Sequence, residues 1–200
     1  MKKYRLTEET TKVGNRTLYR IQALRDFGNV KEGDIGGYIE SEKNLSQDGN
    51  AWVSGDARVY GNACVYGNAR VSDDARVSGN ARVSDDARVS GNAWVYGNAW
   101  VYGNARVSDD ARVSGDSRVS GDADIKTAGD ICSMSGFGSE YRTTTAFRTK
   151  NGDVHVSCGC FFGSLEEFCQ RVESTHGNNL YGREYKKMIE MLKIHFEVEP

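Results

Sequence analysis

The sequence predicts a parallel β-helix that occupies the middle of the chain. A six-residue unit, Ala-x-Val-x-(Gly/Asp)-(Asn/Asp), recurs in thirteen near-copies from Ala51 to Ile125 with no residue inserted or lost. Self-similarity at a fixed short period is typical of solenoid folds, and a six-residue period is typical of a parallel β-helix. In an extended strand the alanine and valine of each unit point inward, while the neighbours of the valine point outward.

The last two residues of each unit predict a corner. Gly-Asn, Asp-Asp and Gly-Asp pairs share these positions, and glycine, asparagine and aspartate accept positive φ more readily than other residues do. Three strands and three corners then make one triangular coil of eighteen residues. Because alanine and valine are small, we expect a narrow, filled column, so any ligand must bind on the outside or at the ends.

Different segments flank the repeats. On the N-terminal side the alternating stretch Leu18–Leu24 predicts a strand that pairs with Tyr4–Leu6 across a turn at Gly14, and we expect this pair to cap the column. Two degenerate repeats at Ile39 and Leu45 bring the expected total to fifteen strands in five coils. The predicted organisation is a cap (1–34), a hexapeptide β-helix (35–125) and a small α+β unit (126–200).

The C-terminal unit is predicted to contain two strands and two helices in the order ββαα. An Asn-Gly turn predicts a hairpin between Thr143–Thr149 and Val154–Phe162. A capping box at Ser164 starts one helix, and apolar residues at helical spacing predict a second, from about Gly182 to Phe196. We expect Gly136–Arg142 to form a flexible loop before the hairpin.

Composition narrows the class of protein. Twenty-six basic and twenty-eight acidic residues give a net charge of −2, which argues against a general nucleic-acid binder and against an acidic DNA mimic. Five cysteines without the spacing of a disulfide framework favour a reduced, cytoplasmic protein. No apolar stretch suits a signal peptide or a membrane span, so we expect no membrane association.

The chain resembles two groups of bacterial proteins. Its repeat unit is similar to the hexapeptide β-helix of bacterial acyltransferases, and this resemblance implies a left-handed helix. A closer resemblance is to the start of the YdcK-type hexapeptide-repeat proteins, which have a transferase label by analogy. The similarity to these proteins lies in four segments: Lys3–Leu6, Ala23–Gly33, Gly36–Ile39 and Asn44–Gln47.

The C-terminal unit resembles uncharacterised proteins of phages and prophages, for which no activity is implied. This resemblance implies a phage or prophage source for the chain. The expected location is then the cytoplasm of the bacterial host.

Catalysis and metal binding are each weighed against a structural role. The resemblance to acyltransferases implies a histidine at a subunit groove, but all three histidines, at 155, 176 and 195, lie in the C-terminal unit. We therefore predict no catalytic residue, and a hexapeptide acyltransferase of unknown substrate is the alternative. Cys158 and Cys160 match zinc-site spacing only weakly, so we expect buried free cysteines and neither a metal nor a cofactor.

The candidate binding site lies on the outer surface of one coil. Residues eighteen apart stack on neighbouring coils, so two Trp-Tyr pairs share one coil and two arginines lie on each adjacent coil. A strand spacing of about 4.8 Å suits contact between guanidinium groups and aromatic rings. The predicted site consists of Trp94, Tyr96, Trp100, Tyr102, Arg76, Arg82, Arg112 and Arg118. Alternatively, the aromatic residues only cover the pleated surface and the arginines pair with the Asp-Asp corners.

These features predict a non-catalytic interaction protein. Aromatic and arginine side chains anchor protein interfaces, so the expected partner is another protein or a second copy of this chain. The partner would bind the outer face of the β-helix, the C-terminal unit, or both. For a phage protein it could be a component of host defence that is inhibited by binding. Binding of a nucleic acid or nucleotide to the same side chains is the remaining alternative.

Overall fold

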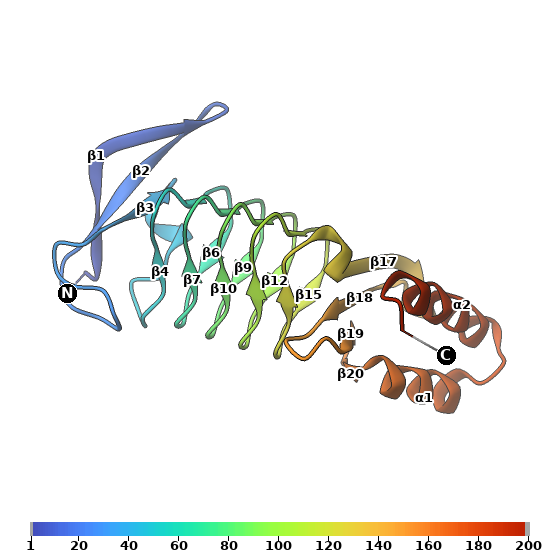
Figure 1. Ribbon diagram of the computed structural model, residues 1–200. Coiled ribbons are helices and arrows are strands. Elements are labelled where there is room, and N and C mark those ends of the chain that lie inside the picture. Colours follow the sequence, from blue (N-terminus) through green and yellow to red (C-terminus); the bar gives the residue numbers. More distant parts are fainter. Residues whose placement is uncertain (1, 199–200) are drawn as a thin grey trace.

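A computed structural model describes residues 2–198 and shows a three-sided β-solenoid between two capping units (Figure 1). Parallel strands of successive coils stack in register, and the partner of each residue lies eighteen positions away, as Arg112 does from Trp94. This register confirms the predicted triangular coil. A strand at Ile39 and a bridge from Leu45 to Val65 precede the regular repeats and complete about five turns.

We name the three faces of the solenoid after the first strand that each contains in the repeats. The β4 face stacks β4 (Trp52–Val53), β7 (Arg70–Val71), β10 (Arg88–Val89), β13 (Arg106–Val107) and β16 (Asp124–Ile125). The β5 face stacks β5 (Arg58–Val59), β8 (Arg76–Val77), β11 (Trp94–Val95) and β14 (Arg112–Val113). The β6 face stacks β6 (Cys64–Val65), β9 (Arg82–Val83), β12 (Trp100–Val101) and β15 (Arg118–Val119).

Small apolar side chains fill the interior of the column. Every inward-pointing alanine and valine of the repeats is fully buried, and together they form one continuous cluster from Ala51 to Ile125. Burial of each valine side chain contributes about 1.5–3 kcal/mol relative to leaving it in water. The filled column leaves only its outer faces and its ends as accessible surface.

The two residues at each corner have different roles. Positive φ falls on the first of them, both where it is glycine, as at Gly97 (73°), and where it is aspartate, as at Asp85 (57°). At six corners the second residue is an asparagine whose side chain donates to the next coil. Asn80 donates to Asn98 at 2.9 Å, and Asn98 donates to Asp116 at 2.8 Å. Such ladders run along the edges of the solenoid and hold successive coils in register.

An N-terminal unit covers one end of the column. It contains β1 (Tyr4–Val13), β2 (Arg16–Ala23) and β3 (Ile35–Ile39), which extend the sheet of the β5 face. The β1–β2 hairpin is the predicted one, and its far half projects beyond the solenoid (Figure 1). Tyr4 and Phe27 pack against Trp52 with ring centroids at 6.4 and 5.4 Å. Trp52 is therefore buried by the cap, although its position in the repeat points it outward.

The C-terminal unit has two more strands than predicted. It contains β17 (Ile131–Phe137), β18 (Arg142–Arg148), β19 (Val154–Cys158), β20 (Phe161–Ser164), α1 (Leu165–His176) and α2 (Leu180–His195). The expected loop begins inside β17, which pairs with β18. The expected strand Val154–Phe162 is two strands, because Gly159 adopts a φ of 61° and turns the chain between them. The capping box at Ser164 is confirmed.

The C-terminal unit closes the other end of the column. Phe147 is fully buried in the solenoid core, Ala123 forms a bridge with Thr149, and the backbone N–H of Arg118 donates to Thr145 Oγ1 at 3.2 Å. With both ends covered, the outer faces of the solenoid remain as its free surface. In the part of the chain that the structure describes, neither helix has the length and apolar character needed to cross a bilayer.

Candidate functional site

The four aromatic residues of the predicted site form two packed pairs. Trp94 lies against Tyr96 on the β5 face with ring centroids 4.9 Å apart, and Trp100 lies against Tyr102 on the β6 face at 5.1 Å. All four side chains are partly exposed. Each pair forms because positions i−1 and i+1 of one repeat point outward from the same short strand. The predicted positions of these four residues are confirmed.

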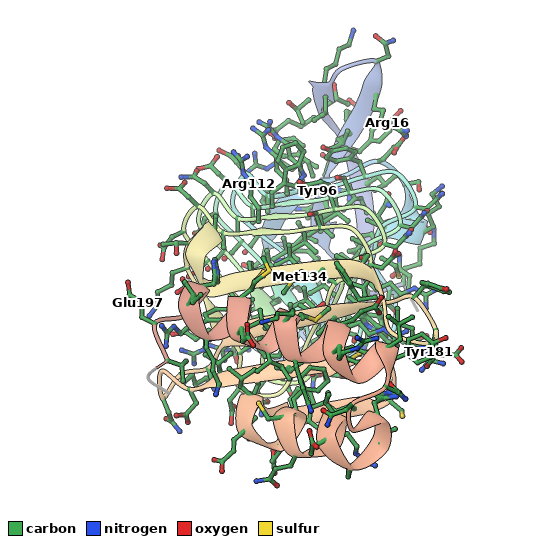
Figure 2. All side chains as sticks on the ribbon, turned by 90° about the vertical axis from the view of Figure 1, so that its right-hand side faces the viewer. Arg16, Tyr96, Arg112, Met134, Tyr181 and Glu197 are labelled. Carbon is green, nitrogen blue, oxygen red and sulfur yellow. The ribbon has the colours of Figure 1, made fainter. Side chains whose placement is uncertain are left out.

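The two aromatic pairs do not merge into one cluster. The corner at Gly97 separates them, and within residues 2–198 no ring contact joins one pair to the other. Figure 2 shows Tyr96 and Arg112 on the side of the molecule from which the hairpin with Arg16 projects, which is the side of the β5 face. A partner that contacts both pairs must therefore wrap around the corner.

The four predicted arginines lie on the coils next to the aromatic pairs. Arg76 and Arg112 flank Trp94 in the sheet, and Arg82 and Arg118 flank Trp100. The Arg82 guanidinium carbon lies 5.9 Å from the centroid of the Trp100 ring, which is within cation–π range.

None of the eight repeat arginines forms an ion pair with any residue that the structure describes. The expected pairing of these arginines with the Asp-Asp corners is therefore absent from the described residues. A guanidinium group has no acceptor of its own and always remains charged, so these side chains are free to pair with an external anion.

The carboxylates of the repeats avoid one edge of the solenoid. We call the corners between the β5 face and the β6 face the asparagine edge: Gly61-Asn62, Gly79-Asn80, Gly97-Asn98 and Gly115-Asp116. The edge between the β4 and β5 faces contains five carboxylates: Asp56, Asp73, Asp74, Asp109 and Asp110. The third edge contains three: Asp85, Asp86 and Asp122.

Positive charge therefore collects around the asparagine edge. The two faces that meet there contain five of the eight repeat arginines: Arg58, Arg76, Arg82, Arg112 and Arg118. The edge itself has one carboxylate, that of Asp116. We call these arginines, the two aromatic pairs and the edge the aromatic–arginine surface.

Two further tyrosines belong to the same columns and were not in the predicted site. Tyr60 and Tyr66 lie two coils before the tyrosines of the aromatic pairs, on the β5 and β6 faces. The serine between each two tyrosines is buried, and Ser78 accepts a hydrogen bond from Trp94 Nε1 at 3.4 Å. Tyr60 and Tyr66 each lie thirty-six residues, or two coils, before a tyrosine of the predicted site, so the sequence alone places both on this surface.

The β4 face offers an internal comparison. It stacks arginines at the same position of the repeat, but serines take the place of the tyrosines and the cap covers its one tryptophan. A shallow pocket of about 430 Å³ lies between Arg70, Arg88 and the neighbouring Asp73. The arginines of this face match those of the predicted site in repeat position, yet have no exposed aromatic residue beside them.

The cysteines of the C-terminal unit agree only partly with expectation. Cys132, Cys158 and Cys169 are half-buried against the apolar core, and burial raises the pKa of the Cys132 and Cys169 thiols. Cys160 is exposed, contrary to expectation, because the turn at Gly159 takes it out of the strand. Over residues 2–198, no group of three or more histidine, cysteine, aspartate or glutamate side chains could hold a metal ion.

The fold and this surface define a β-solenoid that is capped at both ends and displays its distinctive side chains on its flanks. Residues 51–121 match the model of the YdcK β-solenoid repeat, in eight overlapping windows. A stretch of 61 residues is 39% identical to a protein of Escherichia coli (strain K12) named "Uncharacterized acetyltransferase YdcK". The similarity covers 26% of this chain and 19% of that relative. The predicted resemblance of the repeats is thereby confirmed.

Proposed function

We propose that this protein is a non-catalytic binding protein that holds an acidic protein partner on the aromatic–arginine surface. The observation that supports this most is the concentration of partly exposed Trp-Tyr pairs and unpaired arginines around the edge with a single carboxylate. Tryptophan, tyrosine and arginine are the residue types that most often dominate binding energy at protein interfaces.

The chemistry of the partner follows from that surface. Arginine pairs with carboxylates through two parallel hydrogen bonds, and complementary charge speeds association and selects among partners. The ring pairs are held on a rigid sheet and supported by buried serines such as Ser78, so little side-chain freedom is lost on binding. A partner that wraps around the asparagine edge, with Asp or Glu side chains around an apolar centre, fits both faces.

We further propose that the partner is a protein of a bacterial host. The resemblance of residues 126–200 to phage and prophage proteins supports a bacterial host protein as the partner, bound in the host cytoplasm. Inhibition of a defence component is the outcome that such binding would serve. Self-association through the same surface is the second form of the proposal, since a basic patch and the acidic edges of a second copy are complementary.

The test of this proposal removes the aromatic anchors. The double variant Trp94→Ala/Trp100→Ala should keep the fold, because both side chains lie on the outside of the strand. We expect capture of partner proteins from a bacterial lysate, measured by quantitative mass spectrometry, to fall at least about tenfold, as loss of two interface anchors implies. Sedimentation of the purified protein measures self-association in the same pair of samples.

A charge-matched pair of variants makes the test specific. Arg82→Gln/Arg118→Gln removes two charges beside the asparagine edge, and Arg88→Gln/Arg106→Gln removes two charges at equivalent repeat positions on the β4 face. We expect only the first pair to weaken capture. Capture that survives the tryptophan changes, or that falls equally in both arginine pairs, would exclude this surface as the binding site.

The alternative function is acyl transfer, which the name of the YdcK relative suggests. The repeats of this chain contain no histidine to act as a base. A rise in melting temperature on addition of acetyl-CoA would support the enzyme over the binding protein. A shift of a labelled oligonucleotide that weakens steeply with salt would instead support nucleic acid as the ligand.

A further inference from the structure

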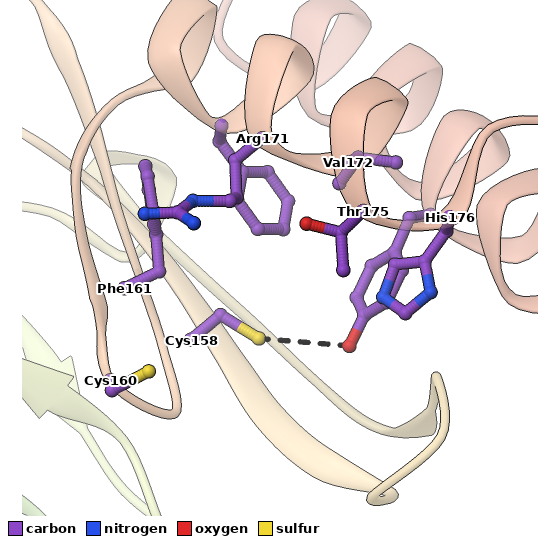
Figure 3. A pocket seen from close by; sticks show the side chains of 9 residues that line it. Cys158, Cys160, Phe161, Arg171, Val172, Thr175 and His176 are labelled. Atoms are coloured by element: carbon purple, nitrogen blue, oxygen red, sulfur yellow. Dashed lines mark hydrogen bonds between the residues drawn. The ribbon is translucent and has the colours of Figure 1, made fainter.

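A cavity in the C-terminal unit has no role in the function proposed above. It measures about 250 Å³ and lies between α1, the turn that joins β19 to β20, and the start of α2 (Figure 3). Nine residues line it, among them Phe161, Phe168, Arg171, Thr175, His176 and Tyr185. A volume of this size lies just below the range of drug-sized sites, so it suits a small metabolite.

Four of the nine residues that line the cavity carry aromatic rings. Phe168 packs against Phe161 at 5.2 Å and meets Tyr185 edge-on at 5.8 Å, while His176 stacks on Tyr185 at 5.6 Å. Rings in fixed relative orientations favour a planar, apolar guest, because flat groups can stack on one ring and meet another by its edge. The wall therefore selects for an aromatic ring in the ligand.

Polar groups at the cavity have unused hydrogen-bonding capacity. Arg171 extends from α1 toward the β19–β20 turn (Figure 3), and its guanidinium group has no partner in the part of the chain that the structure describes. The side chains of Thr175 and His176 also make no hydrogen bond there. Burial raises the pKa of Tyr185 to about 12, so its phenol stays neutral. The Tyr185 hydroxyl lies 3.8 Å from the Cys158 thiol.

The acidic residues closest in sequence to Arg171 are engaged elsewhere. No aspartate or glutamate is among the nine lining residues. Glu167, one turn earlier on α1, accepts the N–H of Ser164 at 2.7 Å, and Glu173 pairs with Lys186 at 2.6 Å. An unpaired guanidinium beside an apolar cavity favours an anion, and a carboxylate matches its two parallel donors.

We propose that this cavity is a binding site for a small aromatic carboxylate, whose ring lies among Phe161, Phe168 and Tyr185 and whose carboxylate pairs with Arg171. The site is separate from the aromatic–arginine surface, so either can exist without the other. Arg171 requires a negatively charged group in the ligand, and the three rings require a planar ring.

The experiment compares a charged probe with its neutral counterpart. Indole-3-acetate and indole-3-acetamide share a ring and differ in the charge of the side group. We expect indole-3-acetate to shift the backbone amide resonances of the lining residues saturably, and the acetamide to bind about tenfold more weakly, as loss of a charged hydrogen-bonded pair implies. Arg171→Gln should reduce indole-3-acetate binding by a similar factor and leave acetamide binding unchanged.

Two controls decide the assignment. Arg183→Gln removes another exposed arginine, on α2 and outside the nine lining residues, and should leave binding of both probes unchanged. The rate of iodoacetamide modification of Cys158, read by peptide mass spectrometry, should fall when indole-3-acetate is bound while that of Cys64 does not. The proposal is overturned if millimolar indole-3-acetate leaves the lining resonances unmoved, if both probes bind equally, or if Arg171→Gln binds like the parent.

Discussion

The substitution Gly97→Ala tests the stacking of coils on which the aromatic–arginine surface depends. Gly97 lies at the corner between the two aromatic pairs and has a φ of 73°. A Cβ atom there would lie 2.9 Å from the backbone nitrogen of Gly115 on the next coil. Gly115 itself has a φ of 64°, and a Cβ at that position meets nothing within 4 Å. Gly115→Ala is therefore a matched control for the backbone cost alone.

The difference between the two variants isolates the clash between coils. An alanine at positive φ costs about 1–2 kcal/mol in either variant, partly offset by about 0.4–1 kcal/mol from the reduced freedom of the unfolded chain. In Gly97→Ala the coils must also move apart, which costs about 1–3 kcal/mol by analogy with overpacked cores. We expect Gly97→Ala to be less stable than Gly115→Ala by this last amount.

Urea unfolding followed by far-ultraviolet circular dichroism measures both free energies of unfolding. Tryptophan fluorescence in the same titration reports on all three tryptophans, of which Trp94 and Trp100 flank the altered corner. Equal losses of stability in the two variants, or a larger loss in Gly115→Ala, would refute the register of coils described here. In that case the grouping of arginines and aromatic residues around the asparagine edge would also be refuted.

Three further predictions concern the two capping units. Phe147→Ala should destabilise the protein by about 3–5 kcal/mol because the ring is buried in the solenoid core, whereas Phe137→Ala, at an exposed ring, should cost far less in the same urea assay. Burial lowers the pKa of Lys3 from 10.5 to about 8, so the unfolded chain binds more protons than the folded chain between these pH values. The free energy of unfolding of the parent, relative to that of Lys3→Met, should therefore rise from about pH 8 to pH 10.5. A fall in this relative free energy over the same range would contradict the prediction. Ser164→Ala should cost about 1 kcal/mol, because its side chain accepts the N–H of Glu167 at the start of α1; an unchanged melting temperature would show that this cap contributes nothing.

The asparagine edge illustrates how far the repeat could be interpreted without coordinates. The period fixes which side chains stack, so the positions of Trp94, Trp100 and their flanking arginines followed from counting eighteen residues. The same counting gives the distribution of aspartates over the three edges. Counting residues does not show which side chains form ion pairs or which are buried. The absence of ion pairs at the repeat arginines and the burial of Trp52 depend on rotamers and on the cap.

The C-terminal unit was less predictable because its contacts are not periodic. The capping box at Ser164 and the second helix are local signals, and both were found. Strand β17, which pairs with β18 through a register shift between Met134 and Phe137, was not predicted from the sequence. The cavity beside Arg171 had no signal at all, since its walls come from β19, β20, α1 and α2, which are separate in the sequence.

The repeat pattern alone therefore specifies the column: its three faces, its filled interior and the order of residues along each flank. In a strict six-residue repeat each residue stacks on the equivalent residue of the next coil, so the structure of one coil defines that of the others. Tertiary structure decided what the repeat does not encode, namely which ends are covered, which tryptophans stay exposed and where a cavity forms. Those outcomes depend on packing between segments that are far apart in the chain, and no local pattern specifies such packing.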